Sequence, residues 1–269
     1  MKRNLLTLIG AGLFMALILW AALSLLNPKV DADPATVDAA NQLYAAGHFD
    51  EAARIYEQEL ARGVQDSAVY YNLGNAYFQQ GDLGRAVLNL QRAAQLDPRD
   101  EDIQANLDLA RAQTTELFVE EPTGPVAFLA NLTGWLTVNE TAVLVVGFWF
   151  LLGFLLLALR QSSTPAARKT LQYALGLVLV LFLLSGVSLA SRTFLAQTQP
   201  AGVVVTPSVA VSTAPGGGGE GPALRGGTEV HVIDRQGEWL RLAVPAGAPE
   251  SWVPSQAVES MALPLSGTS

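Results

Sequence analysis

The chain has 269 residues, of which 50% are hydrophobic and 15% are charged, and its formal net charge is −8. The acidity is concentrated in residues 27–140, where 18 Asp or Glu accompany 7 Lys or Arg. Nucleic-acid binding needs clustered cations, so that function class is excluded. The sequence contains no Cys, which excludes disulfides, thiolate metal sites and a cysteine nucleophile but indicates no compartment.

The first hydrophobic segment is residues 1–26. Lys2 and Arg3 precede an almost unbroken apolar run from Leu5 to Leu26. The apolar core of a signal peptide usually has about 7–15 residues, whereas about 20 residues span a bilayer. The sequence therefore favours an uncleaved signal anchor, and a signal peptide cleaved near residues 30–32 is the alternative.

Residues 34–115 contain a repeat with a constant period. Four positions of the first copy and their counterparts in the second are Leu43 and Tyr77, Gly47 and Gly81, Ala52 and Ala86, and Tyr56 and Leu90, each pair at a shift of 34. The pattern of the second copy is Tyr70, Leu73, Gly74, Tyr77, Gly81, Ala86, Leu90, Ala93 and Pro98. This period and pattern resemble the tetratricopeptide repeat (TPR) family, which implies a solenoid of antiparallel helix pairs.

The residue types of the repeat suit closely packed helices. Small Gly74 and Ala86 let two antiparallel helices approach, and Pro98 ends the second helix of its pair. A truncated third unit is predicted to be a capping helix, because Asn106 lies one repeat period after Asn72. Repeat arrays usually need about three units for stability, so we expect this one to lean on a partner or on the membrane.

The resemblance implies that the first helix of each repeat lines a concave groove. The candidate groove residues are Asn41, Tyr71, Asn75, Phe78 and Asn106. Their amides suit the backbone of an extended peptide; alternatively, these residues only satisfy local contacts between helices. The basic residues of a carboxylate-clamp TPR are missing, so a receptor for chaperone tails is not expected.

Two further apolar segments, residues 137–159 and 171–191, follow a linker at residues 116–136. Each is long enough to cross a bilayer and lacks the polar face of a soluble helix, so both are predicted to be transmembrane helices. Thr137 and Glu140 form the sequence pattern of a capping box at the start of the first one.

The loop between these segments, residues 160–170, sets the predicted orientation. It carries Arg160, Arg168 and Lys169 and no acidic residue, and the positive-inside rule places such a loop in the cytoplasm. The repeat region and the C-terminal region are therefore both predicted to lie on the outer side of the membrane. The apolar segments contain no Asp, Glu, Lys, Arg or His between Thr141 and Leu159 or between residues 171 and 190, so transport is not expected.

Residues 200–262 predict a small all-β module, because short β-branched runs alternate with Gly and Pro. The order Leu-Arg-Gly-Gly-Thr-Glu-Val-His-Val-Ile, then Gly-Glu-Trp-Leu-Arg-Leu, then Trp-Val-Pro resembles bacterial SH3-like domains, which implies a barrel. Trp239 and Trp252 are its candidate ligand contacts, although we favour core positions for both. The glycine-rich loop at residues 215–221 lacks a following Gly-Lys-Ser/Thr and does not predict a phosphate loop.

The sequence offers no catalytic constellation. The two histidines, His48 and His231, have no catalytic neighbour in sequence, and no Gly-x-Ser-x-Gly elbow is present. The carboxylates at residues 100–102 and 120–121 are interpreted as solvated acidic stretches near helix ends. We therefore expect a protein that is not an enzyme, with no catalytic, cofactor-binding or metal-binding residue.

The complete order of segments resembles the BatE-type proteins of bacterial aerotolerance (Bat) operons. The expected fold class is a multidomain membrane protein with an α-helical TPR solenoid, transmembrane helices and a small all-β SH3-like barrel. The resemblance implies partners, namely membrane proteins with von Willebrand A domains and a MoxR-type ATPase, at the bacterial cytoplasmic membrane. The expected function is a scaffold in the cell envelope; the alternative is a sensor that binds cell-wall peptidoglycan.

Overall fold

The computed structural model describes residues 30–114, 124–132, 134–198, 200–217, 221–243 and 251–263. The chain divides into two compact units. The first contains Lys29–Thr123 and Phe194–Ser269, and the second contains Met1–Pro28 and Gly124–Thr193. The predicted signal anchor at residues 1–26 lies outside the described residues, as do residues 115–123 at the start of the predicted linker.

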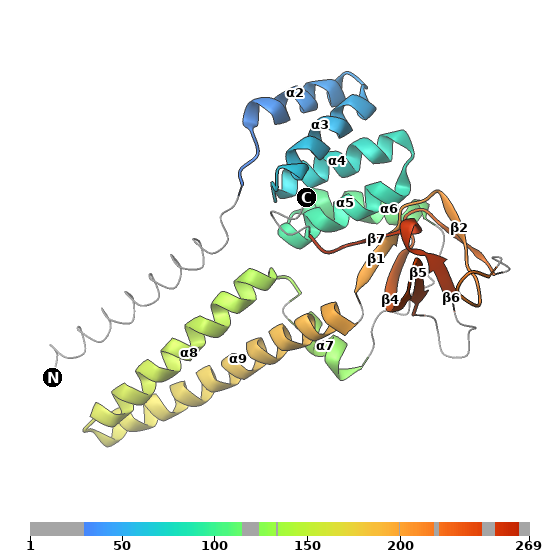
Figure 1. Ribbon diagram of the computed structural model, residues 1–269. Helices are drawn as coiled ribbons and strands as arrows, with labels where there is room; N and C mark the ends of the chain where they lie inside the picture. The colour runs from blue at the N-terminus through green and yellow to red at the C-terminus, as the bar shows by residue number, and fades with distance from the viewer. Residues whose placement is uncertain are drawn as a thin grey trace. The chain divides into compact units, whose positions relative to one another are not determined.

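Helices α2 to α6 form the N-terminal part of the first unit (Figure 1). They are α2 Pro34–Ala45, α3 Phe49–Ala61, α4 Ser67–Gln80, α5 Leu83–Leu96 and α6 Glu101–Gln113. Each helix packs against the next one in the chain, as the predicted solenoid of helix pairs requires. Aspartate carboxylates accept backbone N–H bonds at the starts of α2, α4, α5 and α6, which satisfies donors that the first turn leaves unpaired.

The core of these helices is built from the residues that carry the repeat pattern. Leu73, Tyr77 and Leu90 are buried. A Cβ atom added to Gly74 would lie 2.8 Å from Leu90 Cγ, so the close approach of α4 and α5 requires glycine there. Helix α5 ends at Leu96, two residues before Pro98, where the sequence predicts its end.

The C-terminal part of the first unit is an antiparallel β-module. Its strands are β1 Ala201–Val204, β2 Ser208–Ala210, β3 Ala223–Arg225, β4 Glu229–Gln236, β5 Trp239–Leu242, β6 Ser251–Pro254 and β7 Val258–Ser260. Five of them form a sheet in the order β6-β5-β4-β1-β7, and β2 pairs with β3. The buried side chains between these strands include Val204, Leu224, Val230 and Val253.

This sheet corrects the predicted barrel, because the sheet is not closed. Strands β6 and β7 are its two ends and do not pair with each other. A single 3-10 turn, Ser255–Ala257, joins these short strands, and β7 uses its backbone to pair with β1 instead.

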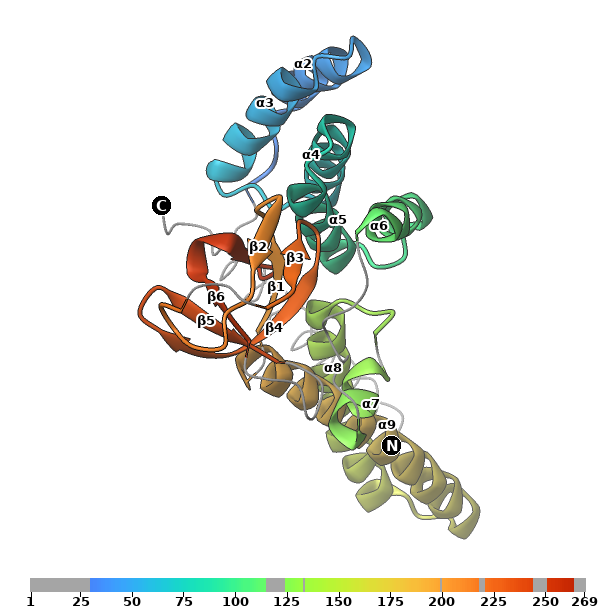
Figure 2. The same cartoon turned by 90° about the vertical axis from the view of Figure 1, so that its right-hand side faces the viewer.

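The β-module packs against α5, and the two parts share one hydrophobic core. Val203 of β1 and Met261, which follows β7, belong to the same buried cluster as Val87 and Leu90 of α5. Figure 2 shows β1 beside α5 from a second direction. We expected the repeat array to be stabilised by a partner or by the membrane. In the structure it packs against strands of its own chain.

The second unit contains α7 Pro125–Asn131, α8 Val138–Gln161 and all but the last turn of α9 Pro165–Thr198 (Figure 1). Helices α8 and α9 are both long and apolar enough to cross a membrane. Only 6% and 22% of their most apolar stretches are buried, whereas the core helix of a soluble protein is mostly buried. Arg192 near the end of α9 donates from Nη1 to the carbonyl of Leu136 at 3.1 Å and to Thr141 Oγ1 at 3.4 Å.

The ends of these helices refine the sequence-based boundaries. The capping box is confirmed, because Thr137 Oγ1 accepts from the Glu140 N–H and the Glu140 carboxylate accepts from the Thr137 N–H. The predicted loop at residues 160–170 is shorter, since α9 begins at Pro165, a residue preorganised for a first helical turn. Helix α9 also continues past residue 191 to Thr198, because Gly and Pro are absent from residues 187–199.

Candidate functional site

The first helix of each repeat, namely α2, α4 and α6, carries equivalent residues on one face, spaced by the repeat period. We call this set of positions the repeat face. Its members are Val37, Asn41 and Tyr44 on α2, Tyr71, Asn75 and Phe78 on α4, and Ala105, Leu109 and Ala112 on α6. All nine side chains are exposed or half-buried, so the face is accessible on the first helices of three successive repeats in the described array.

Asparagine pairs connect these first helices. Asn41 Oδ1 on α2 accepts a hydrogen bond from Asn72 Nδ2 on α4 at 3.0 Å. One repeat later, Asn75 Oδ1 on α4 accepts from Asn106 Nδ2 on α6, also at 3.0 Å. Both pairs have the same sequence separation, because Asn41 and Asn75 are one repeat apart and so are Asn72 and Asn106. The pairs form a polar ladder along the array.

Tyrosine hydroxyls complete this ladder. Tyr56 donates to Asn41 Oδ1 at 2.6 Å, and the Tyr71 hydroxyl accepts from Asn106 Nδ2 at 2.8 Å. Burial raises the pKa of Tyr56 to about 12, with a further contribution from Tyr44, so Tyr56 remains a neutral donor at physiological pH. The amides and hydroxyls therefore hold the first helices at fixed spacing.

The structure brings the five groove candidates together on α2, α4 and α6. Asn41 is exposed, whereas Tyr71, Asn75, Phe78 and Asn106 are half-buried. Phe78 also packs against both helical core clusters. An asparagine amide has two donors and two acceptor sites, so its bond to a neighbouring helix does not exhaust its capacity for a ligand.

Sequence reasoning missed Asn72 and Tyr56 as members of this network. The signal for Asn72 was present, because it lies one repeat period before Asn106. Tyr56 had no such signal, since its hydroxyl reaches Asn41 from a second helix, α3, and only the packing of that helix sets the distance. Leu109 was also missed; it is 52% exposed and lies one repeat period after Asn75.

The charge on the first helices selects against acidic ligands. Helix α4 carries no charged residue, and α2 carries Asp38 alone. Helix α6 carries Glu101, Asp102, Asp108 and one cation, Arg111, whose Nε donates to Glu229 of β4 at 2.7 Å. The repeat face is therefore neutral to acidic, which favours a partner segment that is apolar or basic.

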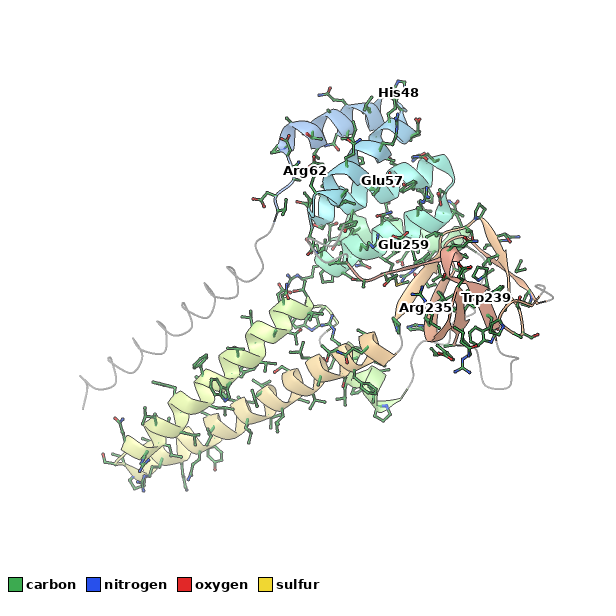
Figure 3. All side chains as sticks on the ribbon, viewed as in Figure 1. His48, Glu57, Arg62, Arg235, Trp239 and Glu259 are labelled. Carbon is green, nitrogen blue, oxygen red and sulfur yellow. The ribbon has the colours of Figure 1, made fainter. Side chains whose placement is uncertain are left out.

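The two candidate tryptophans of the β-module have different environments. Trp252 is 2% exposed, its backbone pairs with that of Ser212, and the Arg241 guanidinium lies 5.9 Å from its ring centre. Trp239 is half-buried and lies at the start of β5 (Figure 3). Of the two, Trp239 is the one that a ligand can reach in this conformation.

The histidines lie apart from each other. His48 is in the turn between α2 and α3, exposed, with Nδ1 3.5 Å from Glu51 (Figure 3), and His231 is in β4. Within the described ranges, no group of three or more His, Cys, Asp or Glu is arranged to hold a metal ion.

Comparison with known families agrees with the helical part of this description. Residues 37–101 match the tetratricopeptide repeat family, so helices α2 to α5 form a TPR-like region, and TPR repeats suggest a module for protein–protein interaction. No curated protein matches the chain.

Proposed function

We propose that this protein is a scaffold, not an enzyme, and that it holds protein partners through its repeat face. The observation that carries the proposal is that the β-module covers one side of the helical array and leaves the other side accessible. The outer side of α5 is covered by β1 and β7 of the same chain, while the repeat face of α2, α4 and α6 is left accessible. The chain uses one side of the array for its own stability and offers the other to a partner.

We further propose that α8 and α9 anchor the scaffold in the bacterial cytoplasmic membrane. Arg160, Arg168 and Lys169 gather where the two helices are joined, which by the positive-inside rule is the cytoplasmic end. The TPR region and an SH3-like β-module then lie on the outer side. The resemblance to BatE-type proteins supplies candidate partners, the von Willebrand A-domain membrane proteins and the MoxR-type ATPase system.

A second candidate function is binding of cell-wall peptidoglycan by the β-module. The observation that favours it is that Trp239, at the start of β5, is only half-buried. Sedimentation of the full chain, in detergent, with purified wall material tests it. Trp239→Ala should abolish co-sedimentation if the wall is the ligand, whereas co-sedimentation that is absent or unchanged by this substitution contradicts the candidate.

Site-specific photocrosslinking tests the scaffold proposal. A photoreactive residue at Asn41 or Leu109 reports on the repeat face, and one at Gln58 is the matched control. Gln58 is exposed on α3 and lies one repeat period before Arg92, a residue whose side chain faces the β-module. We expect adducts with the same partner from Asn41 and Leu109 but not from Gln58, and loss of those adducts in Asn75→Ala.

Equal adducts from all three positions, or none in intact cells, would contradict a partner site on the repeat face. Tyr71→Phe is a milder companion to Asn75→Ala, because it removes only the hydroxyl that accepts from Asn106. It should weaken the adducts without changing helix content.

A topology map tests the anchoring. A reporter that is active only outside the membrane is placed after Gln113, at Ser163 or after Ser269. Activity at Gln113 and Ser269 but not at Ser163 supports the outward-facing scaffold. Activity at Ser163 alone places both modules in the cytoplasm and rejects the cell-wall candidate.

A further inference from the structure

The segment that precedes α8 exposes large apolar side chains although it is short. Val126 and Phe128 of α7 are 40% and 67% exposed, and Leu132 and Trp135 after it are 38% and 63% exposed. The residues from 124 to 139 include no Asp, Glu, Lys, Arg or His. Four large apolar side chains of one uncharged segment are therefore exposed, an arrangement that water does not favour.

A hydrogen bond joins α7 to α9. Ala127 and Ala130 are buried, and Ser188 Oγ of α9 lies 3.4 Å from the Ala130 carbonyl, at hydrogen-bonding distance. Phe128 is two residues from Ala130 and therefore points to a different side of the short helix. The hydrogen bond therefore places α7 beside α9.

These contacts also define the depth of α7 along α9. Ser188 comes four residues before Arg192, about 6 Å along a helix axis. Arg192 is the first charged residue after Lys169, and cations at the end of a membrane span lie at its polar boundary. Ala130, which contacts Ser188, is thus about one helical turn on the apolar side of that boundary.

Apolar side chains near the start of α8 and the end of α9 are exposed as well. Val138 and Val143 of α8 and Val187 of α9 are 47%, 52% and 42% exposed. Helices that lie in a bilayer surface bury their apolar face about 5–10 Å into the boundary between headgroups and acyl chains. Tryptophan is enriched at the same boundary.

We propose that α7 and Trp135 form a membrane-surface element. It contacts lipid at the bilayer interface, on the side of the membrane where α8 begins and α9 ends. The proposal rests on the membrane anchoring of α8 and α9. It replaces the interpretation of residues 124–136 as a linker. Since the segment is uncharged, the recognised feature is the apolar interface of a bilayer, and binding does not require anionic headgroups.

The test uses the full chain in vesicles of phosphatidylcholine. The chain has no Cys, so Phe128→Cys, Leu156→Cys and Leu109→Cys each carry a single nitroxide label. The three native side chains have similar exposure, 67%, 54% and 52%, and lie on α7, α8 and α6. Collision rates with oxygen, which concentrates in lipid, and with an aqueous nickel chelate report the depth of each label.

We expect the label at Phe128 to show an oxygen-to-nickel ratio between those of Leu156, the highest, and Leu109, the lowest. Adding phosphatidylglycerol should leave the ratio unchanged. A Phe128 ratio equal to that of Leu109, with Leu156 still in lipid, overturns the surface element alone. A Leu156 ratio equal to that of Leu109 overturns the anchoring as well. Low collision rates with both reagents at Phe128 indicate packing against protein and also overturn the proposal.

Discussion

Arg92 of α5 donates from Nη2 to Glu259 Oε1 of β7 at 3.0 Å, a contact between residues 167 positions apart (Figure 3 labels Glu259). The same nitrogen donates to the Ser260 carbonyl at 2.8 Å. The Arg92 side chain is 10% exposed, whereas that of Glu259 is 49% exposed. The arginine is therefore largely buried against β7, and its ion pair and hydrogen bond connect the β-module to the repeat array.

Replacing Arg92 with Ala should lower the free energy of unfolding of the first unit by about 1–3 kcal/mol, because it leaves the Ser260 carbonyl without its donor. Arg54→Ala is the control, since Arg54 is exposed on α3, and it should cost less than about 0.5 kcal/mol. Denaturant unfolding of the full chain in detergent, followed by circular dichroism, measures both. Equal effects of the two substitutions would show that the contact contributes nothing specific.

Gly84→Ala should loosen the β-module from α5. A Cβ atom at Gly84 would lie 2.7 Å from the Val204 carbonyl oxygen and 2.8 Å from Val205 Cα, and backbone cannot yield as a side chain does. Overpacking of this kind costs about 1–3 kcal/mol. We expect hydrogen exchange at the Val204 and Val205 amides to accelerate by about 5- to 150-fold.

Gly176→Ala provides the matched control for that experiment. Gly176 is also helical, but in α9 and with no atom within 4 Å of a Cβ. Exchange in β1 should not change in this variant. Unchanged exchange in Gly84→Ala as well would mean that β1 does not pack closely on α5 in solution.

The asparagine ladder predicts coupling between Asn75 and Asn106. Each single substitution by Ala should destabilise the array by about 1 kcal/mol, because the partner amide loses a hydrogen bond. The double variant should cost less than the sum of the two, with an interaction energy of at least about 0.5 kcal/mol. Asn41→Ala with Asn106→Ala is the control pair, and its effects should add; additive effects for Asn75 with Asn106 would contradict the ladder.

Stability should fall in alkaline solution as the buried tyrosines titrate. Burial raises the pKa of Tyr56 to about 12; burial and the hydrogen bond to Glu57 raise the pKa of Tyr77. Unfolded tyrosine loses its proton near pH 10, whereas these folded side chains keep theirs, so the unfolded state binds fewer protons. The free energy of unfolding therefore decreases as pH rises from about 10 to about 12, by at most about 1.4 kcal/mol per pH unit for each tyrosine.

Tyr56→Phe tests the contribution of one hydroxyl to this loss. The variant loses the hydrogen bond to Asn41, so it starts less stable, but its stability should decline less steeply between those pH values. Parallel measurement of tyrosinate absorbance and of helix content gives both quantities. An identical slope in the variant would show that Tyr56 titrates normally in the folded protein.

The sequence alone determined the features that depend on neighbours in the chain. The repeat period predicted the helix pairs and their TPR character, Thr137 and Glu140 predicted the capping box, and the apolar runs predicted two helices able to cross a membrane. These features depend on helical periodicity, local hydrogen bonding and segment length, and each of those properties can be read directly from the order of residues in the sequence.

Only the tertiary structure decided the features that join distant parts of the chain. Arg92 and Glu259 meet across 167 residues, and Gly84 lies against Val204 of β1 and Val205 just after it. No repeat period or motif spacing in the sequence predicts either contact. The different burial of Trp252 and Trp239, for both of which the sequence favoured a core position, and the open ends of the sheet likewise follow from how strands fold over one another. Such contacts form because they complete a shared hydrophobic core, and which surfaces share it depends on the shapes of both folded modules.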